Sequence, residues 1–103
     1  MYSYGMPYPS KVVLQLPLST PEVLAPFVER CIAEDVELIC VVGLAADAIE
    51  DEIDWLVVGD GSNADRFIVT TAHPNEALDQ VVQFATAWTG DGAPAEAPEI
   101  VRL

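Results

Sequence analysis

Basic residues are scarce in this chain. Its 103 residues include 4 Lys or Arg and 17 Asp or Glu, which gives a formal net charge of −13 at pH 7. The four cations are scattered along the sequence, whereas binding to a nucleic-acid backbone needs clustered cations. The composition therefore excludes direct nucleic-acid binding, and it leaves a basic protein as the partner that the charge favours.

Long apolar runs and reactive cysteine patterns are also missing. A membrane helix needs ~20 consecutive apolar residues, and a targeting signal needs a positive start followed by an apolar run. The sequence contains neither pattern, so we expect a cytoplasmic protein without a membrane contact. Cys31 and Cys40 lack metal-ligand or C-x-x-C spacing, which predicts that both are small core residues.

What the chain does contain is apolar periodicity that alternates between strand and helix. The pattern predicts strands within 11–18, 37–42 and 66–71, and helices within 19–35, 45–58 and 74–88. The order β-α-β-α-β-α predicts an α/β fold with a small three-stranded, mainly parallel sheet and right-handed crossovers. The helices could cover both faces of this sheet, as in a doubly wound fold, or only one face.

The two ends of the chain lack this periodicity. Residues 1–10 are rich in Tyr, Pro and Gly and predict an irregular arm, whereas residues 11–89 form the expected core of a single domain, 1–103. Residues 90–103 form a Pro, Ala and Glu tail. Its last five residues could add a short edge strand or bind in trans.

Three local signals concern helix boundaries. Ser19 or Thr20 is expected to cap the first helix, and Pro26 is expected to kink that helix or delay its start. Residues 55–58 could form a strand that feeds a glycine turn. Helical spacing explains more of this stretch, so we predict a helix over 45–58 with Gly59 just past its end.

Four carboxylates form a stripe on the predicted second helix, opposite its apolar face. Such like charges at neighbouring helix positions cost ~0.2–0.5 kcal/mol per pair, so stability does not require them. We predict that they form a binding face for a basic protein together with two Asp residues of the following loop. The alternative is an acidic surface that serves only solubility. The six residues are Asp47, Glu50, Asp51, Asp54, Asp60 and Asp65.

A second candidate site lies at the carboxyl ends of the predicted strands, where parallel sheets bind ligands. This possible ligand crevice comprises Ser19, Thr20, Gly43, Thr71 and His73. His73 precedes Pro74, where a capping or packing role is commoner than catalysis. The sequence contains neither G-x-x-x-x-G-K-[ST] nor G-x-G-x-x-G, and its GDGS loop lacks the ligand spacing of an EF-hand. We therefore expect no catalytic residue, no cofactor and no metal.

The strings DWLVVGDGS (54–62) and RFIVTTAHPNEAL (66–78) carry a resemblance to known sequences. The region 36–90 resembles an uncharacterised group of small acidic bacterial α/β proteins, and this resemblance implies no activity, cofactor or site residue. It implies a bacterial setting, where small acidic domains are often inhibitors or immunity partners of basic toxins and nucleases. By this analogy we expect a non-enzymatic acidic protein-binding module of the immunity or inhibitor type. The alternatives are a small-ligand-binding or enzymatic α/β domain and a structural, self-associating subunit.

Overall fold

The computed structural model describes residues 7–62, 66–90 and 95–103. Strands and helices alternate along this part of the chain, as the apolar periodicity predicted. The elements are β1 (Lys11–Gln15), the 3₁₀-helix η1 (Pro21–Val23), α1 (Leu24–Ala33), β2 (Leu38–Val42), α2 (Ala46–Val58), β3 (Val69–His73), α3 (Leu78–Ala87) and β4 (Glu99–Arg102).

The sheet has four parallel strands in the order β3-β2-β1-β4. The predicted parallel pairing of the second and third strands is confirmed, with Cys40 aligned to Thr71. The predicted three-stranded sheet is wrong, because Glu99–Arg102 pairs with β1 and aligns Ile100 with Val13. The last residues therefore form the short edge strand that the sequence left open as an alternative. Four residues are too few to show a period, so their pairing with β1 defines them as a strand.

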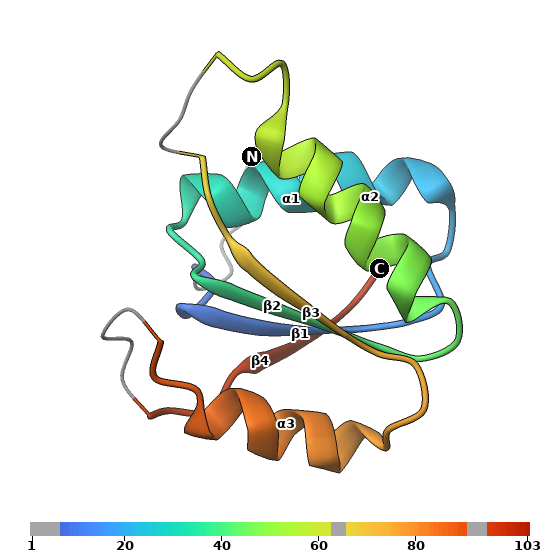
Figure 1. The fold of residues 1–103 in the computed structure, drawn as a ribbon, viewed down its shortest axis with the longest axis vertical. Helices are drawn as coiled ribbons and strands as arrows, with labels where there is room; N and C mark the ends of the chain where they lie inside the picture. The colour runs from blue at the N-terminus through green and yellow to red at the C-terminus, as the bar shows by residue number, and fades with distance from the viewer. Residues whose placement is uncertain (1–6, 63–65, 91–94) are drawn as a thin grey trace.

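Helices cover both faces of the sheet, with α1 and α2 on one face and α3 on the other (Figure 1). This arrangement is the doubly wound alternative. Alternation along β1 explains it, because Val12 and Leu14 point into the core under α1 and α2 while Val13 points into the core under α3. Both cores are therefore built on β1, which lies in the middle of the sheet and is almost fully buried.

Lys11 is fully buried at the start of β1, on the α3 side of the sheet. Its Nζ donates hydrogen bonds of 2.9 Å to the carbonyl oxygen of Ala85 and 3.0 Å to that of Thr86. These carbonyls lie in the last turn of α3, which is the negative end of the helix dipole. The ammonium thus ties the first strand to the end of the last helix.

The start of α1 shows how Pro26 is accommodated. Pro26 lies in the first turn of α1, where its missing N–H would have no partner within the helix, and η1 precedes it. The delayed start is therefore the observed outcome. The expected side-chain cap is wrong for Thr20, since that residue occupies the cap position of η1 but makes no capping hydrogen bond among the described residues.

The predicted helix over 45–58 is confirmed as α2. Ala45 adopts a left-handed conformation (φ 67°) just before it, and Gly59 (φ 62°) follows the last helical residue. The N–H of Gly59 donates to the carbonyl oxygen of Trp55 at 3.0 Å, which closes the final turn. Residues 55–58 are therefore helical and do not form a strand.

The boundaries around β3 differ from those predicted. The strand spans Val69–His73 instead of 66–71, because pairing with β2 begins where Val69 aligns with Leu38. The last helix begins at Leu78 instead of Pro74. Gln80 accounts for this start, because its side-chain oxygen accepts the N–H of Ala77 at 3.0 Å.

Cys31 and Cys40 are free, buried core residues, as predicted. Burial raises the pKa of the Cys31 thiol to about 12 and also raises the pKa of Cys40. Both thiols therefore stay protonated near neutral pH.

None of the helices in the described ranges is long and apolar enough to cross a membrane.

Candidate functional site

The acidic stripe lies on α2, as its spacing predicted, but its four carboxylates have different surroundings. Ala46, Ile53 and Val57 turn one side of the helix into the core. Asp47 and Asp51 are exposed to solvent on the outer side. The other two stripe residues, the half-buried Glu50 and the exposed Asp54, lie along the flank of α2 that faces β3.

Glu50 and Asp54 converge on one hydroxyl group of β3. The Oγ1 atom of Thr70 lies 2.9 Å from Oε2 of Glu50 and 2.6 Å from Oδ1 of Asp54. A hydroxyl has a single hydrogen to donate, so it can satisfy one of these carboxylates at a time. Within the described part of the chain neither carboxylate forms an ion pair. Two adjacent negative charges thus share one weak donor.

A groove of about 410 Å³ runs between α2 and β3, beside these carboxylates. Glu50, Asp54 and Thr70 line one end, and Val58 and Phe67 line the other. Phe67 is 69% exposed and Val58 is 50% exposed. The groove therefore joins an acidic end to an exposed apolar end, along a strand at the edge of the sheet.

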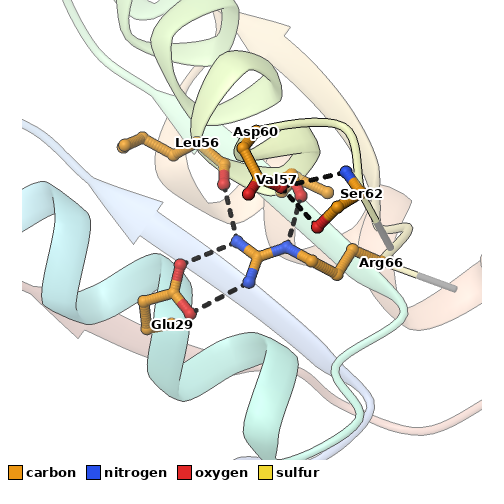
Figure 2. Close-up of polar contacts among 6 residues, drawn as sticks. All are labelled: Glu29, Leu56, Val57, Asp60, Ser62 and Arg66. Carbon is orange, nitrogen blue, oxygen red and sulfur yellow. Dashed lines mark hydrogen bonds and ion pairs between the residues drawn. The ribbon is translucent and has the colours of Figure 1, made fainter. Parts of the chain in front are cut away.

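Arg66 fixes the end of α2 that borders this groove (Figure 2). Its Nε donates to the carbonyl oxygen of Val57 at 2.8 Å, and its Nη2 donates to that of Leu56 at 2.8 Å. Its Nη1 and Nη2 also hold the carboxylate of Glu29 on α1, at 3.2 and 2.7 Å. These hydrogen bonds lower the pKa of Glu29 and raise that of Arg66. The guanidinium is thus held at the helix end by Glu29 and two carbonyl oxygens, and among the described residues it forms no ion pair with Glu50 or Asp54.

Asp60 is held in the turn that follows α2. Oδ1 of Asp60 accepts hydrogen bonds from the backbone N–H of Ser62 at 2.9 Å and from its hydroxyl at 2.6 Å (Figure 2). These bonds lower the pKa of Asp60 and hold its carboxylate in the turn, near Arg66 and Glu29. Asp65 lies outside the described residues. Sequence reasoning placed neither Thr70 nor Arg66 beside the stripe, because only the packing of α2 on β3 gives either residue its role.

The predicted ligand crevice separates into two places. Ser19 and Thr20 line a cavity of about 370 Å³ next to Leu44 and Ile49, at the carboxyl ends of β1 and β2. Gly43 stands beside this cavity with φ 125°, and a Cβ on it would lie 3.1 Å from the Cβ of Leu16. The cavity is bordered mainly by apolar side chains, with two hydroxyls and the carboxylate of Glu52, and neither Thr71 nor His73 lines it.

Thr71 and His73 lie on the α3 side of the sheet, where they belong to a chain of polar contacts. The Oγ1 of Thr71 lies 2.7 Å from Nε2 of His73, and Nδ1 of His73 contacts the carboxylate of Glu76. His73 is buried, and the centroid of its imidazole lies 5.3 Å from the ring centroid of Phe84. The order hydroxyl, imidazole, carboxylate is that of an activated nucleophile. Sequence reasoning missed Glu76, although its position three residues after His73 was a usable signal.

Among the described residues, no group of three or more His, Cys, Asp or Glu side chains could hold a metal ion.

Comparison with known proteins places the chain in a family. Residues 5–101 match the model of a domain of unknown function (DUF7684), so the chain belongs to that family. No curated protein and no solved structure matches the chain.

Proposed function

We propose that this protein is a non-enzymatic acidic protein-binding module, an immunity or inhibitor-type partner of a basic protein, and that the face formed by α2 and β3 binds this partner. A bacterial, cytoplasmic setting is part of the same proposal. The face comprises the stripe residues and the groove, and its members are Asp47, Glu50, Asp51, Asp54, Val58, Phe67 and Thr70.

The observation that carries this proposal is the meeting of two carboxylates at one hydroxyl. Glu50 and Asp54 lie four residues apart on a helix, and like charges at that spacing destabilise it. An arrangement selected for stability would place a cation there. Arg66 borders the same groove, but its guanidinium is held by Glu29 and by the end of α2. A cationic side chain from a partner would compensate the two charges.

The field of the whole molecule acts in the same direction. A net charge of −13 attracts a basic surface over distances longer than a contact, which raises the rate of encounter. Salt screens such attraction within ~10 Å at 0.1 M ionic strength. Association with the partner is therefore expected to be fast and to weaken as salt is added.

The experiment uses a triple variant, Glu50→Gln, Asp51→Asn and Asp54→Asn, which removes charge at nearly constant shape. A partner is first recovered by pull-down from native lysate, and its affinity for both proteins is measured at low and moderate salt. We expect weaker binding by the variant, chiefly at low salt, and a free energy of unfolding that is unchanged or higher by a few tenths of a kcal/mol. Equal affinities at both salts would assign the stripe to solubility alone.

A second candidate function rests on the cavity beside Ser19 and Thr20. Its volume of about 370 Å³ falls in the range of small-molecule sites, which supports a ligand-binding or enzymatic domain. His73 is the group to test for chemistry, since it contacts both Thr71 and Glu76. A substrate screen that finds an activity, together with its loss in a folded His73→Ala variant, would favour this function over protein binding.

A further inference from the structure

Beyond its charge, the α2–β3 face has an open strand edge. Among the strands of residues 7–62, 66–90 and 95–103, β3 is the last on its side of the sheet, and only β2 pairs with it. The N–H of Val69 donates to the carbonyl oxygen of Glu37, and the carbonyl oxygen of His73 accepts the N–H of Gly43. In a parallel strand these directions alternate, so Thr70 and Ala72 direct their N–H and C=O groups away from β2. These groups can pair with another strand.

We infer that the protein binds an extended segment of its basic partner as an added strand along β3, and that a Lys or Arg of this segment contacts Glu50 and Asp54. The inference rests on the proposed function and specifies its mode of binding. Backbone groups of Thr70 and Ala72 would supply hydrogen bonds, and the groove would supply side-chain selectivity, as in known cases of strand addition.

The geometry of the groove defines the pattern of the segment. Alternate residues of an added strand point to the same side of the sheet. A residue beside Thr70 that points toward α2 would lie at the two carboxylates, which selects a cation. The next residue on the same side, level with Ile68, would lie at the apolar end of the groove, near Val58 and Phe67. The segment therefore carries a basic and an apolar residue separated by one position.

Charge complementarity favours this occupant over a second copy of the chain. The four residues of this chain's other edge strand, Glu99–Arg102, include one cation, Arg102. That side chain is bound to Gln15 at 2.8 Å. The chain as a whole has a charge of −13, so two copies would repel each other at an acidic groove.

The test uses capped peptides with the pattern Thr-Val-Thr-Lys-Thr-Val-Thr, which places Val on both sides of Lys and so fits either strand direction. Affinity and the affected amides are measured by NMR titration of the full chain. We expect shifts at Thr70 and Ala72, and binding weaker by about tenfold or more when Lys is replaced by Glu or when alternate peptide nitrogens are methylated. Methylation removes the strand donors but keeps the charge.

Variants of the protein separate the two claims. Glu50→Gln with Asp54→Asn should weaken peptide binding by about tenfold, while the matched control, Asp47→Asn with Asp51→Asn, removes the same charge from the outer side of α2 and should weaken it much less. Ala72→Pro removes one outward N–H and should abolish the peptide shifts. If this variant does not fold, the methylated peptide still tests whether binding needs the backbone hydrogen bonds of an added strand.

The outcomes are distinguishable. Equal binding of the normal and methylated peptides would overturn strand addition but would leave a basic partner in place, provided that the charge variants still weaken binding. Equal loss in both double charge variants would overturn the specific role of Glu50 and Asp54. Peptide-induced dimers in light scattering would identify a second copy as the occupant and would overturn the inference. Insensitivity of all binding to the charge variants would refute the proposed function itself.

Discussion

The buried ammonium of Lys11 provides a quantitative test of how the first strand is joined to α3. Lys11→Met removes the charge but keeps most of the apolar stem, whereas Lys11→Ala also removes three methylene groups. The two substitutions therefore separate the polar role of the side chain from its packing role.

The magnitudes follow from the two carbonyls that Lys11 contacts. The carbonyl oxygen of Ala85 also accepts the N–H of Trp88 at 3.2 Å, so it keeps a partner without the ammonium. That of Thr86 is partly buried and loses its Lys11 bond. An unsatisfied buried acceptor costs about 1–3 kcal/mol, and access of water at Thr86 favours the lower half of that range. We expect Lys11→Met to lower the free energy of unfolding by about 1–2 kcal/mol.

Lys11→Ala adds the loss of apolar burial to this cost. Three methylenes at about 0.8 kcal/mol each contribute about 2.4 kcal/mol, which brings the expected loss to about 4 kcal/mol. Urea unfolding followed by circular dichroism measures both values, and amide exchange should show faster opening of the last turn of α3 in both variants. Arg102→Met, which removes a cation from an exposed edge, is the charge-matched control and should cost less than either.

A Lys11→Met variant as stable as the wild type would contradict this role of the ammonium, because the contact with Thr86 would then contribute nothing to the free energy of unfolding. Equal losses of the free energy of unfolding in Lys11→Met and Lys11→Ala would contradict the packing role of the side chain. The apolar stem would then contribute nothing to stability, although the side chain is completely buried.

Two further predictions concern ionisable groups. Cys31 and Cys40 should not react with a thiol reagent at pH 8 in the native protein, because burial raises both pKa values, and both should react once urea unfolds the chain. Arg66 lowers the pKa of Glu29, so the stability that this pair adds should be complete above the ordinary carboxyl value of about 4.3 and should be lost as pH falls through the lowered pKa. Wild type and Glu29→Gln should therefore differ in stability at pH 7 and converge in acid; a constant difference would contradict the assignment.

The sequence predicted well those features that depend on neighbours along the chain. Helical spacing of the apolar residues identified α2 within one residue of its observed start, and it placed four carboxylates on one helix. The apolar run 37–42 identified β2. These patterns are local, because helix and strand periods are visible within one or two turns.

Other features required partners distant in sequence. The short β4 is defined by its pairing with β1, and β3 begins where it meets β2 rather than at Arg66. Local residues alone do not explain either boundary, since strand ends depend on the register of the neighbouring strand.

The site divides in the same way. Spacing along α2 determined that its carboxylates would lie close together, because residues four apart on a helix share a face. Only the tertiary structure decided that Glu50 and Asp54 meet Thr70, that Arg66 is engaged by Glu29, and that His73 lies on the α3 side, away from Ser19. The physical reason is that a side chain's role depends on which atoms reach within hydrogen-bond distance, and here sheet pairing and helix packing bring those atoms together across many residues of sequence.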